Sequence, residues 1–192
     1  MNVPAPKIRH LPNLFAHLAK SLSPFVCITL LCSTVQVRAE SGAAAEYAVK
    51  AAYIYNILRF ISWDENSALA QSETLDICLF KTDPFNHYLD PIRKKSIGNK
   101  RIKLRTINDI SQSSSCHLIF INNDDFDLDK IKHSNSILLG NTIEFVKRGG
   151  LFSFYIENNK VRLGANRNAI AETELNISSQ LLEVSQLYGE RR

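Results

Sequence analysis

The strongest helical pattern in the chain covers residues 46–63, where no glycine or proline interrupts the run. Apolar side chains recur there every three or four positions, as in a helix with a buried face. The first apolar stripe consists of Tyr47, Ala51, Ile54, Leu58 and Ile61, and the second of Tyr53, Ile57 and Phe60. The polar strip with Glu46, Lys50 and Arg59 is narrow, which predicts a helix covered on more than one side.

Two kinds of cover would satisfy this helix. Its own domain could bury both stripes, or a partner protein could cover part of them. Large apolar and aromatic side chains anchor protein interfaces, and exposed apolar patches mark partner sites. Tyr47, Tyr53, Ile57 and Phe60 are therefore the candidate interface residues.

Downstream of this helix, short apolar runs alternate with segments that begin like helices. The runs expected to form strands cover residues 75–80, 100–107, 116–121 and 136–139. Helices are expected at residues 83–95, 124–133, 143–147, 166–172 and 178–188. Residues 151–156 and 160–165 are expected to form a hairpin around Asn158 and Asn159, which tolerate the positive φ of tight turns.

Strands that alternate with helices indicate βαβ units and a parallel sheet. We therefore predict an α/β fold: a Rossmann-like three-layer sandwich, with a largely parallel sheet and a C-terminal antiparallel hairpin. The expected order of the parallel strands, numbered along the chain, is 2-1-3-4. Basic and apolar residues alternate along residues 100–107, which predicts that this strand has one solvated face and lies at the edge of the sheet.

The N-terminal residues 1–39 have the three parts of a secretory signal. Lys7, Arg9, His10 and Lys20 form a basic region, and an apolar stretch follows at residues 22–35. Cleavage is expected after Ala39, which leaves residues 40–192 as a single domain that works outside the cytoplasm. The alternative is an uncleaved membrane anchor.

The net charge of +4 belongs to this N-terminal segment, because residues 1–39 contain four basic and no acidic side chains. Residues 40–192 contain 19 of each and are formally neutral. Nucleic-acid binding requires a positive surface, so neutrality argues against it. A local basic cluster remains at Arg93, Lys94, Lys95, Lys100, Arg101, Lys103 and Arg105. It is either a solvated helix end and edge strand, or a surface for an anionic ligand or acidic partner.

Two cysteines remain after cleavage, Cys78 and Cys116. An isolated pair in an oxidising compartment is expected to form a disulfide, with two buried free thiols as the alternative.

A search for catalytic chemistry is mostly negative. The sequence has no glycine-rich phosphate loop and no nucleophile elbow, and its histidines lack metal-ligand spacing. Asp125, Asp127 and Asp129 match the first ligand positions of an EF-hand, but Lys130 and Ser136 replace its essential glycine and glutamate. We expect no metal, no cofactor and no enzymatic activity. A binding protein is the favoured class, with an envelope enzyme as a minor alternative.

Open parallel sheets bind ligands beyond the carboxyl ends of their strands, where the strand order reverses. In the predicted order this crevice lies between the first and third strands. The loops that would rim it contain the ligand-crevice candidates Asp83, Phe85, Asn122 and Asn123.

Several segments, in order, resemble one family of periplasmic regulatory proteins, the YfiR family. They are residues 46–56 and 60–63 in the first helix, 76–79 and 83–85, 116–121, 145–150, 160–162 and 177–182. The resemblance covers essentially the whole of residues 40–192 and departs from the family pattern at Asp64, at residues 139–141 and at residues 163–166.

The resemblance implies a dimeric, non-enzymatic α/β regulator in the periplasm, with a disulfide that would fall on Cys78 and Cys116. It implies that the protein binds and represses an inner-membrane diguanylate cyclase, and that an OmpA-like outer-membrane lipoprotein can relieve the repression. Such a protein would control cyclic di-GMP signalling and biofilm formation. The alternative is a periplasmic small-molecule sensor that acts on another membrane receptor, such as a histidine kinase.

Overall fold

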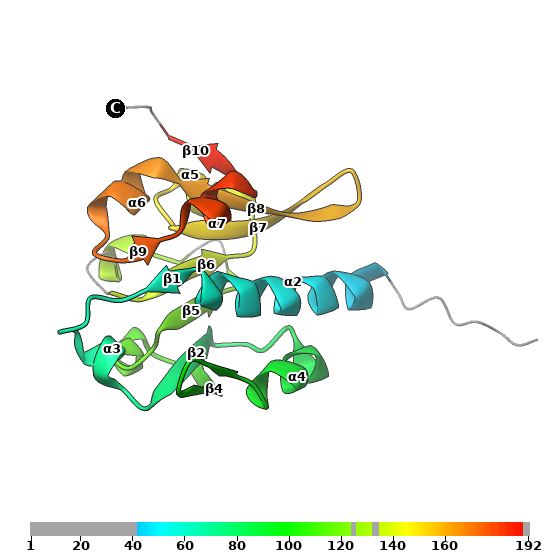
Figure 1. Ribbon diagram of the computed structural model, residues 1–192. Helices are drawn as coiled ribbons and strands as arrows, with labels where there is room; N and C mark the ends of the chain where they lie inside the picture. Colours follow the sequence, from blue (N-terminus) through cyan, green and yellow to red (C-terminus); the bar gives the residue numbers. More distant parts are fainter. Residues whose placement is uncertain (1–41, 124–125, 132–134, 190–192) are drawn as a thin grey trace, which may run out of the picture. The chain divides into compact units, whose positions relative to one another are not determined.

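The computed structural model describes residues 42–123, 126–131 and 135–189 (Figure 1). The predicted signal, residues 1–39, lies outside the described residues. So do Asp124 and Asp125, which were expected to begin a helix, and residues 132–134 at its end.

One eight-stranded sheet, in the order β10-β8-β7-β6-β5-β2-β4-β3, forms the centre of the described chain (Figure 1). Its parallel strands are β2 (Thr74–Phe80), β4 (Lys100–Ile107), β5 (Leu118–Ile121) and β6 (Ile137–Gly140). The order of these four confirms the predicted 2-1-3-4 arrangement, because β2 pairs with both β4 and β5, and β6 follows β5.

The C-terminal half adds the predicted hairpin of β7 (Phe152–Glu157) and β8 (Lys160–Asn166), which pair antiparallel. Asn158 and Asn159 form its turn with φ values of 51° and 58°. The short strand β3 (Ser96–Ile97) pairs with Lys100 and Arg101 and leaves the rest of β4 at the edge of the sheet, as predicted for this strand.

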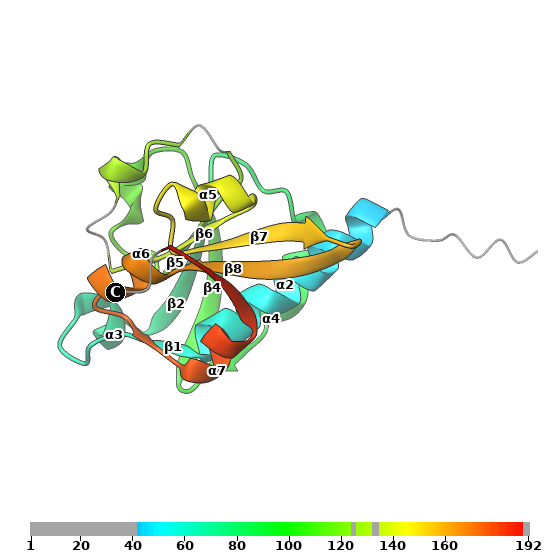
Figure 2. The same cartoon turned by 90° about the horizontal axis from the view of Figure 1, so that it is seen from above.

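Helices cover both faces of the sheet (Figure 2). Helix α2 (Gly42–Arg59) crosses one face, beside the 3₁₀ turn η2 (Asn86–Leu89) and helix α4 (Asp90–Arg93). Helix α5 (Ile143–Lys147) lies on the opposite face, which completes the predicted three-layer α/β sandwich. The remaining short elements are α3 (Ala68–Gln71), η3 (Ile110–Ser113), η4 (Leu128–Lys130), α6 (Arg167–Glu172) and α7 (Ser179–Glu183).

A small two-stranded sheet links the segment that follows α2 to a segment near the C-terminus. Strand β1 (Ile61–Ser62) pairs antiparallel with β9 (Asn176–Ile177). The first helix was predicted to continue to residue 63, but α2 ends at Arg59 because this pairing extends the backbone from Ile61.

Two other predicted helices are wrong in extent. The helix expected over residues 83–95 is a capped turn, η2 and α4, because Asn86 has a φ of 50°, which an α-helix does not accept. The helix expected over residues 178–188 ends at Glu183, and β10 (Ser185–Tyr188) follows as a strand parallel to β8. The open edge of β8 offers hydrogen bonds that override the local helical pattern.

Two close contacts hold the core together: a disulfide between strands, and the packing of α5 against the sheet. Cys78 of β2 and Cys116, just before β5, form a disulfide between neighbouring strands, as expected, and both are fully buried. On the opposite face from α2, the ring of Phe145 lies against Gly140 and Gly150, where an added Cβ would stand only 2.2 Å from ring carbons. Glycine at these two positions lets α5 approach the sheet closely.

Candidate functional site

Helix α2 buries one side against the sheet and leaves the other side open (Figure 2). The buried side contributes Ala51, Ile54, Ile57 and Leu58 to the core. The exposed side, which we call the outer face of α2, consists of Ala45, Val49, Ala52 and Asn56, with the charged Arg59 at its C-terminal end. Val49 is 44% exposed. A surface helix normally carries charged residues on its solvent side, so this mostly apolar face marks a candidate interaction surface.

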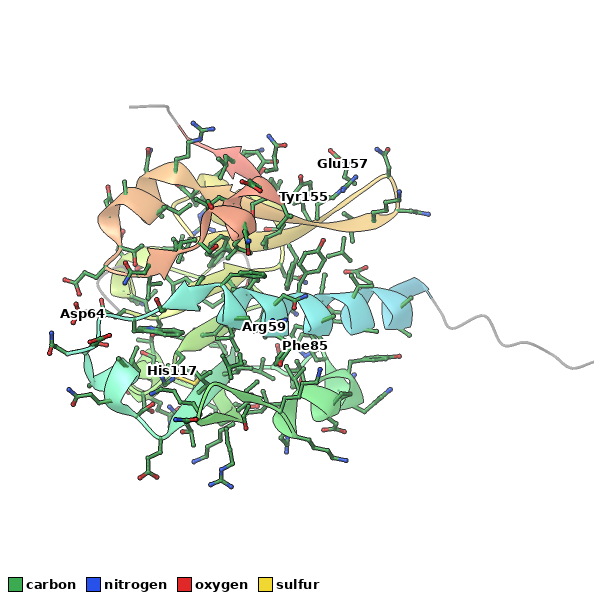
Figure 3. The ribbon with its side chains drawn as sticks, viewed as in Figure 1. Arg59, Asp64, Phe85, His117, Tyr155 and Glu157 are labelled. Atoms are coloured by element: carbon green, nitrogen blue, oxygen red, sulfur yellow. A yellow bond between two sulfur atoms is a disulfide. The ribbon has the colours of Figure 1, made fainter. Side chains whose placement is uncertain are left out.

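A groove of about 500 Å³, the hairpin groove, separates the first half of α2 from the β7–β8 hairpin. Val49 and Tyr53 line it from the helix, and Ile156 and Val161 line it from the hairpin. Ile156 is 49% exposed, while the Tyr53 ring packs edge-on against Phe154 at 5.9 Å between centroids. Tyr155 and Glu157, labelled in Figure 3, locate strand β7 of the hairpin. The groove has the volume of an ordinary ligand or peptide site.

A second groove of about 490 Å³, the α4 groove, follows the other flank of α2. Ala48 and Ala52 contribute only methyl groups to it, while Tyr55 and Tyr88 provide aromatic surface. Lys95 Nζ lies 4.4 Å from the centroid of the Tyr55 ring, which places a cation over its aromatic wall. The outer face of α2 and its two flanking grooves therefore form one largely apolar surface.

Beneath α2, Lys50 forms a polar network at the carboxyl ends of β5 and β6. Its Nζ donates to Asn141 Oδ1 at 2.6 Å and pairs with the Glu46 carboxylate. Asn141 Nδ2 in turn donates to Asn122 Oδ1 at 2.7 Å. Lys50 is only 2% exposed, and a buried cation is tolerated only with such partners. The network fixes the position of α2 on the sheet.

The predicted ligand crevice is therefore occupied by the chain's own side chains. Asn122 lies at the expected strand end but is bonded to Asn141, and Asn123 is exposed. Asp83 Oδ1 caps the following turn by accepting from the N–H groups of Phe85 at 2.8 Å and Asn86 at 3.2 Å.

Phe85 is fully buried beneath α2 (Figure 3), so its prediction as a ligand contact is wrong. Its ring packs edge-on against Phe120 at 4.8 Å and Tyr47 at 5.3 Å between centroids. It is a core residue because these aromatic contacts enclose it.

The four interface candidates on α2 differ in how far their side chains are exposed. Tyr47, Tyr53 and Phe60 are half-buried and keep some accessible surface. Ile57 is 0% exposed, so the prediction that its side chain contacts a partner is wrong. Its stripe faces the sheet, whereas the exposed positions are one residue earlier, at Ala52 and Asn56. Small residues such as these carry no clear interface signal in the sequence, because large aromatic and apolar side chains are the usual anchors.

A second polar cluster lies at the amino ends of β2 and β5, near the disulfide. His117 Nδ1 accepts from the Asp76 N–H at 3.1 Å, so the ring proton is on Nε2, 2.9 Å from the Leu69 carbonyl oxygen. Trp63 packs edge-on against the ring at 4.9 Å. Burial is the main cause that lowers the pKa of His117, with smaller opposing effects from its hydrogen bonds. The geometry is that of a neutral structural histidine.

Among residues 42–123, 126–131 and 135–189, no three histidine, cysteine or acidic side chains are grouped so as to hold a metal ion. Over the same residues, no helix combines the length and apolar character needed to cross a bilayer.

The fold and the site together define a small α/β domain that presents a largely apolar helix face between two grooves. Comparison with protein families then identifies it further. A family model described as YfiR/HmsC-like matches residues 47–186, and the chain belongs to this family. Membership confirms the family resemblance predicted from the sequence.

Two solved structures are similar to this chain. One is a conserved domain protein from Vibrio cholerae O1 biovar El Tor, at 11% identity, with a TM-score of 0.43 over 73% of this chain and 59% of that one. The other is an ABC domain in complex with L-Trp from Streptococcus pneumonia, at 9% identity, with a TM-score of 0.46 over 77% and 60%. This chain thus spans 59% and 60% of their lengths. A comparison with curated proteins gives no match.

Proposed function

We propose that this protein is an exported, non-enzymatic regulator that binds and represses the periplasmic part of an inner-membrane diguanylate cyclase. Membership of the YfiR/HmsC-like family is the observation that carries the proposal. In this proposal residues 1–39 direct export and are removed. A repressor of this kind must bind the inactive state of its partner more tightly than the active state, because equal affinity would shift nothing.

The outer face of α2 is the surface that best suits the partner. It presents Val49, Ala52 and the walls of two grooves, so a partner could bury apolar area over the length of the helix. A homodimer could use part of the same surface, and an OmpA-like lipoprotein that captures the regulator would relieve repression.

Deletion of the gene tests the proposal directly. Cellular cyclic di-GMP should rise in the deletion strain and fall again when an exported copy is restored. A copy without residues 1–39 should fail, since it would remain on the wrong side of the membrane. Unchanged cyclic di-GMP, with the envelope cyclases expressed, would reject a cyclase as the partner.

Val49→Asp tests the surface separately. The side chain is 44% exposed, so the charge should leave the fold intact while it weakens a partner that packs against α2. The matched control is Glu144→Lys, an exposed charge change on the opposite side of the sheet. If the Val49→Asp variant represses as strongly as the wild type, the outer face of α2 is not the interface.

One observation favours a second candidate function. The two grooves, at about 500 and 490 Å³, are large enough for a small ligand. A sensor that signals to another receptor, such as a histidine kinase, would show ligand-dependent stability without any effect of gene deletion on cyclic di-GMP.

A further inference from the structure

The charges of this protein are unevenly distributed. Residues 40–192 contain 19 basic and 19 acidic side chains, but seven of the basic ones lie between positions 93 and 105. No aspartate or glutamate occurs from position 91 to position 108. The remaining positions therefore hold 12 basic against 19 acidic residues, so a neutral domain carries one strongly positive segment.

The fold gathers this segment at one edge of the sheet. It comprises the end of α4, strand β3 and most of β4, and β4 lies at the lower end of the sheet in Figure 1. The Ile102 N–H donates to the Lys95 carbonyl oxygen at 3.1 Å, which holds the end of α4 beside β4. Arg101 and Lys103 share the face of β4 that is paired with Asp76, away from α2. Cations thus flank the sheet edge on both sides, and we call this region the basic edge.

Three of the seven basic side chains make contacts within the protein. Lys100 Nζ donates to backbone carbonyl oxygens, including Leu69 O at 3.4 Å, and ties α3 to β4. Arg105 Nε lies 3.4 Å from Asp76 Oδ2. Lys95 lies over the Tyr55 ring.

The other four basic residues of this segment are Arg93, Lys94, Arg101 and Lys103. All four are exposed, and within the described residues none of their side chains has a hydrogen bond or an ion pair. Like charges held this close repel one another, which opposes folding unless an anionic surface compensates them. An acidic surface outside the protein would remove this repulsion.

The neighbouring surface indicates what kind of anion is involved. The α4 groove, with Tyr55, Tyr88 and Pro91, begins beside Lys95. Tyrosine next to lysine and arginine is typical of proteins at the membrane–water interface, where the rings lie at the headgroup level. Long, exposed cations spread along a sheet edge suit a continuous field of negative charge more than one fixed phosphate.

We propose that the basic edge binds the anionic phospholipid headgroups of a membrane surface. Lipid contact would confine the regulator to the layer in which the periplasmic part of its partner lies, which raises the local concentration for binding. This consequence rests on the proposed function, whereas the lipid contact itself does not.

Sedimentation with lipid vesicles tests the proposal on residues 40–192 purified from the periplasm. The wild type should bind vesicles with roughly 30% phosphatidylglycerol, not pure phosphatidylcholine, and should dissociate at about 0.5 M NaCl. Neutralising one cation should lower the partition coefficient about five-fold. The test variant carries glutamine at all four free positions, Arg93, Lys94, Arg101 and Lys103.

A matched control variant has the same change in net charge at exposed positions elsewhere. It carries glutamine at Lys130, Lys147, Lys160 and Arg162. The proposal predicts that the test variant loses binding at least ten-fold while the control stays within about two-fold of the wild type. All eight side chains are exposed, so circular dichroism should show both variants folded.

Three results would overturn the proposal. They are no binding of the wild type to anionic vesicles, equal loss in both variants, and binding that persists in the test variant. If vesicles do not bind but the test variant loses repression in cells, the basic edge contacts an acidic protein instead. If vesicles bind but gene deletion leaves cyclic di-GMP unchanged, the proposed function fails and the lipid contact stands.

Discussion

Lys50 Nζ donates a 2.6 Å hydrogen bond to Asn141 Oδ1, and this contact joins the first helix to the end of the fourth parallel strand. The two residues are 91 positions apart in the sequence. Lys50 also pairs with Glu46, which lines the hairpin groove. The position of the candidate binding face is therefore coupled to a buried charge.

Replacement of Lys50 by methionine should destabilise the protein by about 2 kcal/mol, because Asn141 loses a partner in a buried site while Glu46 can still reach water. Urea denaturation followed by circular dichroism measures the change. Lys147→Met, which removes an exposed pair with Glu144, is the control and should change the free energy of unfolding by less than about 0.5 kcal/mol. Equal stability of the two variants would show that the network contributes nothing.

Ile57→Asp should unfold the protein or cost more than about 4 kcal/mol, since the side chain is 0% exposed and a carboxylate would be buried without a partner. Val49→Asp changes an exposed position of the same helix, so this variant should retain the circular dichroism spectrum and melting temperature of the wild type. If the Ile57→Asp variant folds but its oligomeric state or partner binding changes, then Ile57 does belong to an interface.

Removal of the disulfide by the double change Cys78→Ala and Cys116→Ala should lower the free energy of unfolding by about 4 kcal/mol, from the loop entropy of two positions 38 residues apart. Both sulfur atoms belong to the disulfide, so free-thiol labelling of oxidised residues 40–192 should detect no thiol even after denaturation. Comparison of melting temperatures with and without reductant provides an independent measurement on the unmutated chain.

Stability should fall as the pH drops below about 6.5, because His117 is held neutral in the folded state and its pKa is lowered. The unfolded chain binds the proton at higher pH than the folded chain, so the contribution is complete above the unfolded pKa and is lost progressively below it. His117→Asn should flatten the dependence of unfolding free energy on pH between 7 and 5, at a roughly 2 kcal/mol cost at pH 7.5.

Gly150→Ala should destabilise the protein by more than about 2 kcal/mol, because its Cβ would stand 2.2 Å from the Phe145 ring and 2.9 Å from a backbone oxygen. Gly42→Ala, with open space around the new methyl group, should be neutral or slightly stabilising. Thermal unfolding of both variants separates close packing from the general effect of replacing a glycine. Similar melting temperatures would mean that α5 can move away from the sheet.

The sequence predicts the sheet well because β2, β5 and β6 are short apolar runs bounded by polar turns, whereas β4 alternates basic and apolar residues. It fails where tertiary contacts override local pattern, as at Ser185–Tyr188, whose strand depends on the free edge of β8. The site is harder to predict for the same reason. Asn141 contacts Lys50 only through the fold, although a lysine in the narrow polar strip of an apolar helix already indicates a partly buried cation.

The pairing of Ile61–Ser62 with Asn176–Ile177 has a consequence for how the chain folds. The segment after the first helix finds its strand partner only near the C-terminus, and Leu175 and Leu181 of that region belong to the same core as α2. Contacts between distant positions slow folding. In the export that we propose, a chain still emerging from a membrane pore would lack these contacts until the C-terminal strand had passed. The order of elements would then keep the chain open during passage and complete its hydrophobic core only on release.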